Sequence, residues 1–256
     1  MTHRFVLAAA AAPAAILCAA FPAMAETQNP FAGWYIGANL GGVWGDASGS
    51  VTTAPGTGAV VIPPADVSAI NAASTGSSST SGFTGGVEGG FNWVNEGVLF
   101  GIETDWGAMD ISQGANRTVN STFTLTPPLV YSLDNHVHTD WVWTLRPRLG
   151  FVGNDWLVYG TVGLAVTDVK NSLTYADTHT PARTVSTSSS DTKSGWVAGL
   201  GGAWAFSPQW SLKGEWLYTD FGTVTATAMT SDGFVAVKSD ASVRGNLFRV
   251  GIDYRF

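Results

Sequence analysis

The chain has 256 residues, of which 45% are hydrophobic and only 12% are charged, with 31 glycines and 11 tryptophans. An ordinary soluble domain carries roughly twice that charged fraction. The 12 basic and 19 acidic residues give a formal net charge of −7, which argues against a nucleic-acid partner because such proteins present a basic face. The length excludes a small disulfide scaffold. This composition indicates a β-rich chain, one side of which need not face water.

The start of the chain has the pattern of a secretory signal peptide. Arg4 precedes an apolar, alanine-rich run from Phe5 to Phe21. Small residues follow at Ala23 and Ala25, the two positions that a signal peptidase reads. We expect cleavage between Ala25 and Glu26, so that residues 1–25 are the signal peptide and residues 26–256 are the mature barrel domain. The only cysteine lies within the predicted leader, so the mature chain is expected to hold neither a disulfide nor a cysteine-ligated metal.

Alternation of apolar and polar residues with a period of two recurs along the rest of the chain and predicts β-strands. The eight predicted strands cover residues 34–44, 82–93, 98–110, 139–152, 156–168, 194–206, 210–222 and 244–256. Short connections alternate with long ones, which are Asp46–Ser81, Ile111–His138, Val169–Lys193 and Thr223–Val243. This arrangement is typical of an eight-stranded antiparallel up-and-down transmembrane β-barrel with short periplasmic turns and four long outer loops.

Large apolar side chains occupy one face of each predicted strand. In the last strand, Phe248 and Val250 share one face, whereas Arg249 and Asp253 share the other. Eight strands enclose a section too small for eight faces of Trp, Phe and Leu side chains. The bulky face is therefore predicted to point outward into lipid, with charged, glycine and small residues inside.

Aromatic residues gather near both ends of the predicted strands, as expected where amphipathic rings settle at the two lipid–water interfaces. The predicted aromatic girdle consists of Trp34, Trp93, Trp156, Trp204, Trp210 and Tyr254 near the short turns, and of Trp44, Trp106, Trp141 and Trp196 toward the long connections. The alternative is that these rings fill the core of a soluble β-sandwich.

Ten charged residues fall on the predicted inward face. They are Glu88, Glu103, Asp105, Glu215 and Asp253, together with Arg146, Arg148, Lys213, Arg249 and Arg255. Enclosed charges are costly unless they are paired, so five acids and five bases predict a salt-bridge network that plugs the lumen. The alternative is that the same charges line a water path and select ions, although an eight-stranded barrel leaves little room for one.

Other candidate sites are weaker. His136 and His138, with Tyr131 nearby, are the candidate ligands for haem or a metal. A histidine pair without a third fixed ligand more often faces solvent, so we predict no metal and no cofactor. The predicted strands contain no histidine, so an acyl hydrolase on the barrel wall would lack its general base. The chain is therefore expected not to be an enzyme.

Five segments carry a family resemblance: Gly33–Gly42, Leu145–Gly150, Tyr159–Ala165, Trp210–Gly222 and Phe248–Phe256. Together they resemble the alphaproteobacterial outer-membrane immunogenic proteins, a RopB-like, porin-opacity class with an architecture similar to OmpA and OmpX. The resemblance implies an eight-stranded barrel integral to the outer membrane. The terminal aromatic pair, Tyr254 and Phe256, is similar to the signal that the barrel-assembly machinery reads.

Two features depart from the pattern of that family. Pro147 lies in mid-strand, where it removes a backbone donor and predicts a bulge. The first long connection, Asp46–Ser81, is long enough to suggest a binding role.

The leading functional hypothesis is a non-enzymatic outer-membrane protein that contributes to envelope structure and interacts through its outer loops. The alternatives are a narrow porin-like channel and a surface receptor for haem, because the fold alone does not fix the role. The expected partners are outer-membrane lipid, lipopolysaccharide, the barrel-assembly machinery and host or phage surface molecules, with no nucleic acid.

Overall fold

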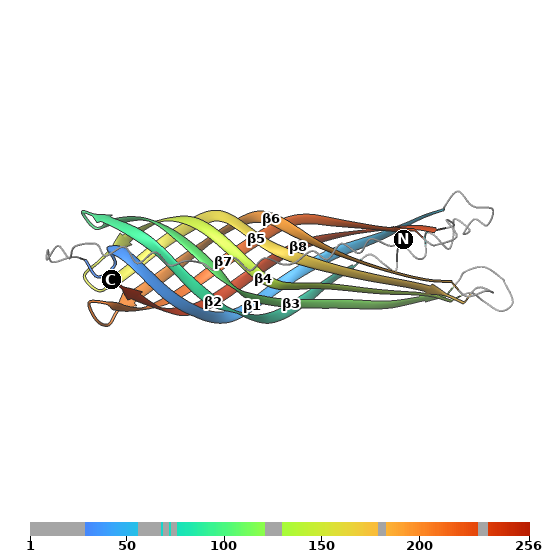
Figure 1. Cartoon of the computed structure of the whole chain (residues 1–256), viewed down its shortest axis with the longest axis horizontal. Helices are drawn as coiled ribbons and strands as arrows, with labels where there is room; N and C mark the ends of the chain where they lie inside the picture. The colour runs from blue at the N-terminus through green and yellow to red at the C-terminus, as the bar shows by residue number, and fades with distance from the viewer. Residues whose placement is uncertain are drawn as a thin grey trace, which may run out of the picture.

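A computed structural model describes residues 29–55, 68, 72, 76–120, 130–178, 183–229 and 235–256. Antiparallel strands follow one another in chain order and close when the last strand pairs with the first (Figure 1). The strands are β1 (Gly33–Pro55), β2 (Gly76–Asn95), β3 (Val98–Asn120), β4 (Val130–Val152), β5 (Trp156–Asp177), β6 (Arg183–Ala205), β7 (Trp210–Met229) and β8 (Val235–Arg255). The predicted eight-stranded up-and-down barrel is confirmed.

The predicted signal peptide over residues 1–25, with its cleavage site at Ala25 and Glu26, lies outside the described residues. Within the part of the chain that the structure describes, no helix is both long and apolar enough to cross a membrane.

The predicted strand ends next to the long connections were wrong. β1 continues to Pro55 and β2 begins at Gly76, so strand structure covers much of what was assigned to loops. The strands have 20 to 23 residues, whereas crossing a membrane takes about 9–11. The alternation of apolar and polar residues that indicates a strand is missing from these Ser- and Thr-rich segments, although their backbone still pairs.

The barrel is closed only in the part that carries the short turns. β2 and β3 pair from Asn95 and Val98 as far as Phe83 and Asp110. β6 and β7 pair only as far as Trp196 and Asp220, whereas the other six strand pairs continue beyond this level. Beyond this level the described strands separate into two four-stranded sheets, β3–β4–β5–β6 and β7–β8–β1–β2 (Figure 1). We call these two sheets together the extension.

The predicted bulge at Pro147 was also wrong. Pro147 pairs with Ile102 in an unbroken stretch of the β3–β4 register, and its carbonyl oxygen accepts a hydrogen bond from the Thr161 hydroxyl at 2.9 Å. Towards β5, pairing is interrupted at Arg146 and Pro147 and resumes at Arg148 in the same register, so the missing N–H donor opens the ladder without causing a bulge. Register shifts occur instead near the base of the extension, between Ala108 and Ile111 on β3, between His138 and Val142 on β4, and between Asp220 and Thr223 on β7.

Bulky apolar side chains cover the outer wall of the closed part. Trp106, Leu149 and Phe248 are 62%, 61% and 53% exposed, whereas the neighbouring charged residues Asp105 and Arg249 are 3% and 4% exposed. This is the reverse of a soluble protein, in which the large apolar residues would be buried. The wall therefore presents its hydrophobic surface to the surroundings and needs an apolar solvent.

The aromatic residues lie at the two ends of this wall. Near the short turns, the rings of Trp210 and Tyr254 meet edge to face, with their centres 4.9 Å apart. Near the extension, the ring centres of Trp196 and Tyr218 lie 5.3 Å apart. Eight of the predicted girdle residues are more than 40% exposed, namely Trp34, Trp44, Trp93, Trp106, Trp156, Trp196, Trp204 and Trp210. Trp141 and Tyr254 are half-buried.

A closed barrel should keep its shape in sodium dodecyl sulfate until it is heated, because an opened barrel would leave strand edges unpaired in an apolar medium. We expect unboiled protein to migrate differently from boiled protein on a denaturing gel, and to become sensitive to protease in its wall only after boiling. Identical mobility before and after boiling would contradict the closed architecture.

Candidate functional site

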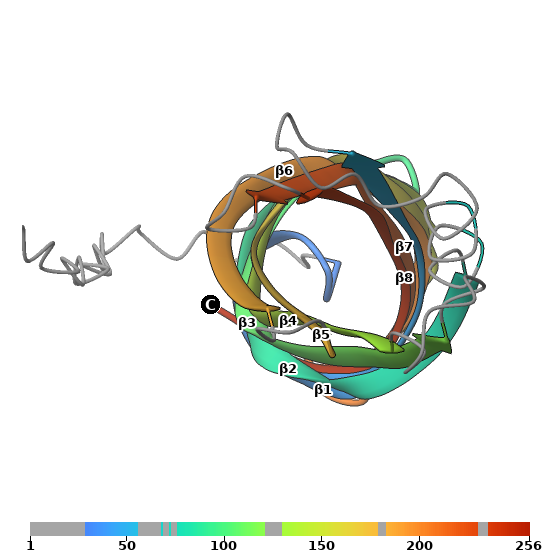
Figure 2. The same cartoon turned by 90° about the vertical axis from the view of Figure 1, so that its right-hand side faces the viewer.

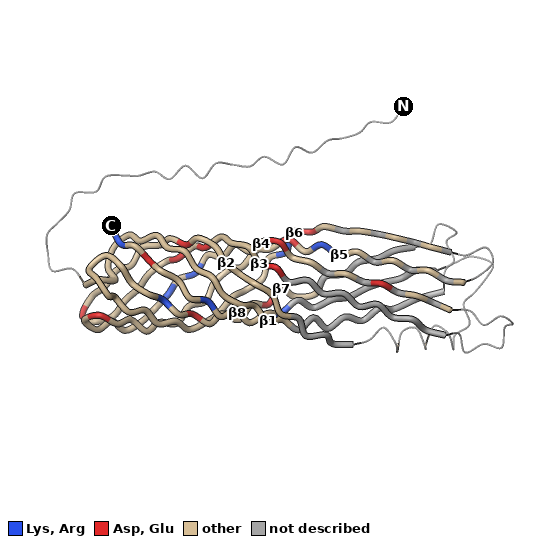
Figure 3. Tube along the Cα trace, turned by 90° about the horizontal axis from the view of Figure 1, so that it is seen from below, with Lys and Arg blue, Asp and Glu red and all other residues tan. Residues whose placement is uncertain are grey.

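Charged residues recur along the strands in the closed part of the barrel (Figure 3). Nine of the ten residues predicted for the lumen are less than 8% exposed there: Glu88, Glu103, Asp105, Arg146, Arg148, Lys213, Glu215, Arg249 and Asp253. They come from β2, β3, β4, β7 and β8. We call them, with the polar residues bonded to them, the charged layer.

Arg146 lies at the centre of the charged layer, and its side chain is fully buried. It donates hydrogen bonds to Glu103 Oε1 at 2.5 Å, to Asp105 Oδ2 at 2.9 Å and to Glu215 Oε1 at 3.0 Å. Arg249 contacts two of the same carboxylates, Asp105 at 3.0 Å and Glu215 at 2.7 Å. Two guanidinium groups and two carboxylates therefore alternate in a closed ring.

Glu103 connects this ring to a second group of polar side chains. Its Oε2 accepts hydrogen bonds from Arg148 at 2.9 Å, Lys213 at 3.1 Å and the Tyr35 hydroxyl at 2.6 Å. Lys213 Nζ also lies 2.6 Å from Glu88 Oε1. Buried charges are tolerated when partners replace the lost water, and here each bridging group has several.

The strand register brings these charges to one level. Glu103 lies directly opposite Arg146 across the β3–β4 pair, and Glu215 lies opposite Arg249 across the β7–β8 pair. Opposite charges in such positions attract each other across a sheet. The alternation of the strands then points all four side chains into the lumen, so pairs on opposite sides of the barrel meet in the middle.

Two inward tyrosines belong to the charged layer and were not predicted. The guanidinium carbon of Arg148 lies 4.6 Å from the Tyr35 ring centre and 5.1 Å from the Tyr159 ring centre, within the range of cation–π contacts. The Tyr159 hydroxyl donates to Glu215 at 3.1 Å. The available signal was position, because Tyr35 alternates with outward-facing Trp34 and so belongs to the inward set.

Glycines make room for these large side chains on the inner wall. A Cβ atom at Gly37 would lie 2.0 Å from Asp253 Oδ1, and one at Gly201 would lie 2.4 Å from the ring of Tyr159. Both distances are far below van der Waals contact. The high glycine content therefore serves a specific purpose here: glycine on one strand faces a bulky or charged residue on the next.

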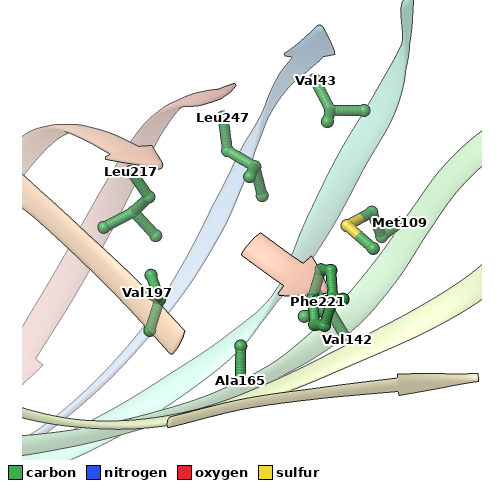
Figure 4. Packing of buried hydrophobic residues seen from close by; sticks show 8 residues of the cluster. All are labelled: Val43, Met109, Val142, Ala165, Val197, Leu217, Phe221 and Leu247. Carbon is green, nitrogen blue, oxygen red and sulfur yellow. The ribbon is translucent and has the colours of Figure 1, made fainter. Parts of the chain in front are cut away.

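An apolar layer lies between the charged layer and the extension along the strands, and Figure 4 shows its side chains. Its eight residues are at most 4% exposed and come from seven strands: Val43, Met109, Val142, Ala165, Val197, Leu217, Phe221 and Leu247. We call this the outer apolar layer. The expectation that the inward face would hold only charged, glycine and small residues was wrong at this level, because a lumen too narrow for water can be filled by side chains of either kind.

A second apolar cluster closes the end that carries the short turns. We call it the inner apolar layer, and it consists of Phe31, Leu99, Val152, Leu157, Tyr159 and Ala203. Because Tyr159 belongs to this cluster and also donates to Glu215, the inner apolar layer is continuous with the charged layer.

The segment Asn29–Ala32, just before β1, folds back into this end of the barrel (Figure 2). Phe31 is 6% exposed within the inner apolar layer. The carbonyl oxygen of Phe31 accepts a hydrogen bond from Asn92 at 2.8 Å, and that of Ala32 accepts one from Arg255 at 3.2 Å. The chain leading into the first strand therefore acts as a stopper, which the sequence did not indicate.

Arg255 differs from the other predicted lumen residues in its position. It lies at the short-turn end, where its guanidinium donates to the carbonyl oxygens of Pro208 and Ala32. The buried charged layer therefore contains four basic and five acidic residues rather than five of each. Arg255 is the last residue of β8, which is why it reaches the turns and not the centre.

The two candidate histidine ligands lie on the extended part of β4 rather than in a loop. His136 Nε2 lies 3.1 Å from Asp134, and His138 Nε2 lies 2.6 Å from Asp140. The side chain of Tyr131 lies outside the described set. Among the side chains that the structure describes, no group of three or more His, Cys, Asp or Glu residues could hold a metal ion.

Comparison with known proteins gives a consistent assignment. Residues 11–256 match the family model of the outer membrane protein beta-barrel domain. The chain is 33% identical over 179 residues to the 31 kDa outer-membrane immunogenic protein of Brucella melitensis, covering 68% of this chain and 67% of that protein. It is 29% identical over 144 residues to the 22 kDa outer membrane protein of Rhizobium leguminosarum bv. viciae, covering 56% and 54%.

Among solved structures, the outer membrane protein OprG of Pseudomonas aeruginosa aligns with a TM-score of 0.50 at 14% identity, covering 88% of this chain and 96% of OprG. At this level of identity the likeness concerns the fold alone.

The buried and exposed arginines of this barrel provide a matched comparison. Arg146→Met leaves three carboxylates without a central partner, so we expect the free energy of unfolding to fall by about 3–5 kcal/mol. Arg244 pairs with Asp220 at 3.1 Å on the outer surface and is 58% exposed, so Arg244→Met should cost no more than about 1 kcal/mol. Urea unfolding in lipid vesicles measures both. Equal losses for the two variants would contradict a buried charged layer.

Proposed function

The chain belongs to the outer membrane protein β-barrel family, and on that basis we propose that it is a non-conducting, non-enzymatic integral outer-membrane protein whose barrel anchors the extension at the cell surface. One observation carries the proposal: the charged layer is enclosed between two apolar layers.

The layered lumen favours an anchor over a pore. An ion crossing the barrel would have to leave water at the outer apolar layer, where Val43 and Val197 are fully buried and Leu247 is 1% exposed. Apolar constrictions of this kind exclude ions because they exclude water. An ion would then meet a charged layer whose members already bind each other, and finally the inner apolar layer with its Phe31 stopper.

The orientation of the barrel follows from the two kinds of connection. Barrels of the outer membrane turn their short connections toward the periplasm and their long elements toward the outside. The short turns here lie at the end with the stopper segment, and the strands of the extension lie at the other. The extension is therefore the part available to molecules outside the cell, which supports a role in surface interaction.

The outer wall, the end of β8 and the extension each suit a different kind of partner. The exposed apolar residues between the aromatic girdles are suited to lipid, with lipopolysaccharide on the side of the extension. The exposed Phe256 follows β8, and its ring centre lies 5.5 Å from that of Tyr254; this aromatic pair is suited to the barrel-assembly machinery. Host or phage surface molecules are the candidates for the extension.

A narrow porin-like channel is the competing function, because charged residues do line the centre of the barrel. Planar-bilayer recording separates the two. We expect no discrete current steps from the wild-type protein, and none from Arg148→Gln. A channel predicts steps whose size and ion preference change when Glu103 is replaced by Gln.

The absence of current is informative only if a separate measurement shows that the protein is folded and inserted in the bilayer. Heat-dependent gel migration of the reconstituted protein establishes that the barrel is folded, and an unrelated porin added to the same bilayer establishes that currents can be detected. Reproducible steps from wild-type protein that Glu103→Gln alters would overturn the proposal of a sealed barrel.

A further inference from the structure

The extension leaves strand edges open where the barrel splits. On β6, residues Arg183–Ser190 pair with β5 on one side, but pairing with β7 stops at Trp196. On β3, residues Ile111–Asn120 pair with β4, but pairing with β2 stops at Asp110. Within the described strands, each of these edges therefore presents a row of backbone N–H and C=O groups that no neighbouring strand takes up.

The strand edge of β6 is left open because the backbone of β7 turns away from β6. After Asp220 the register of β7 shifts, and Gly222 takes a φ of +70°, a conformation that favours glycine. The Gly222 N–H donates to the Asp220 side chain at 2.8 Å, which fixes this turn of the backbone. β7 therefore leaves β6 at a defined position, and the gap does not arise from simple fraying of strand ends.

The parts of these edges far from the split lack the usual protection against pairing. Proteins commonly block a long open edge with proline, with several charges or by keeping the edge strand short. The outer part of the β6 edge, Arg183–Ser190, reads Arg-Thr-Val-Ser-Thr-Ser-Ser-Ser, with no proline and one charge, whereas the charged residues Asp191 and Lys193 stand between this segment and the split at Trp196. The β3 edge over Ile111–Asn120 also contains one charge and no proline. An edge that is long, β-prone and unblocked is suited to accept another strand.

We propose that the β6 edge of the extension, Arg183–Ser190, binds an extended segment of another polypeptide as an added antiparallel strand. Alternating donors and acceptors at strand spacing match an extended peptide backbone, whereas a sugar or lipid headgroup lacks that repeat. The added strand would take the position that β7 vacates. This inference rests on the proposed function, since the extension has to lie outside the membrane to meet such a partner.

A peptide that copies β7 beyond its turn is the natural probe. Thr223–Met229 has the sequence Thr-Val-Thr-Ala-Thr-Ala-Met. Continued beyond Trp196 and Asp220, the β6–β7 register would place this peptide opposite Thr187–Lys193, so that it covers the proposed edge at Thr187–Ser190. We expect a fluorescent form, with flanking lysines for solubility, to bind the whole folded protein in detergent with saturable anisotropy. No saturation up to about 1 mM would overturn the proposal.

Backbone methylation of the probe separates strand addition from side-chain binding. In an antiparallel pair, the N–H groups of alternate residues point to opposite sides of a strand. Methylating the alternate amides that face β6 should weaken binding by at least about tenfold, because several hydrogen bonds are lost. Methylating the other set should leave the affinity unchanged. Equal effects of the two sets would contradict an added strand.

Proline pairs in β6 provide the matched variants on the protein. Ser188→Pro with Ser190→Pro removes donors on one side of β6, and Thr187→Pro with Ser189→Pro removes them on the other. We expect the pair facing the open edge to keep heat-dependent gel migration and to lose peptide binding. If that folded variant binds the peptide with wild-type affinity, the proposal fails.

The other occupant of this edge would be a second copy of the chain. Sedimentation in detergent distinguishes it: a dimer that the edge-facing proline pair dissociates would assign the edge to self-association and overturn the proposal. Bilayer recordings remain a separate readout. If the barrel conducts no ions and binds no peptide, the proposed function stands and the strand-addition proposal is wrong. If the barrel conducts ions and binds the peptide, the proposal of a sealed barrel is wrong and strand addition stands.

Discussion

The burial of Arg146 is the constraint on which the closed part of the barrel depends. A guanidinium group without access to water must find carboxylates at hydrogen-bond distance, and Glu103, Asp105 and Glu215 supply them from two other strands. This requirement fixes which face of each strand points inward. Once the inward faces are fixed, the bulky residues on the alternate positions have to face outward, and the wall becomes compatible only with lipid.

The lumen combines three layers with different physical roles. The charged layer specifies how the strands are aligned, since a shift by one residue would turn each charge toward lipid. The apolar layers on either side exclude water and so strengthen the electrostatic attraction between the buried groups. Glycines such as Gly37 and Gly201 allow this dense filling because a Cβ atom at either position would overlap a buried side chain.

Sequence patterning was sufficient to predict the strands of the closed barrel, because membrane strands alternate strictly between bulky residues and small or charged ones. It failed for the extension, where residues such as Ser186 and Ser188 face water and the alternation is lost although the strands continue. The apolar layers were missed for a different reason. Leu247 and Leu217 fall in the inward set by position, but which inward residues meet across the lumen depends on the relative heights of all eight strands, and single-strand patterns do not contain that information. The same holds for Phe31, whose role depends on a fold-back before β1.

Alternating accessibility along β8 tests the central claim most directly. Single cysteines placed in turn from Leu247 to Asp253, in the folded protein in lipid vesicles, can be challenged with a water-soluble and a lipid-soluble maleimide. Cysteines at 248, 250 and 252 should react only with the lipid-soluble reagent, and those at 247, 249, 251 and 253 should resist the water-soluble one until the barrel is unfolded. Rapid reaction of the odd-numbered set with the water-soluble reagent in the folded state would contradict a sealed lumen.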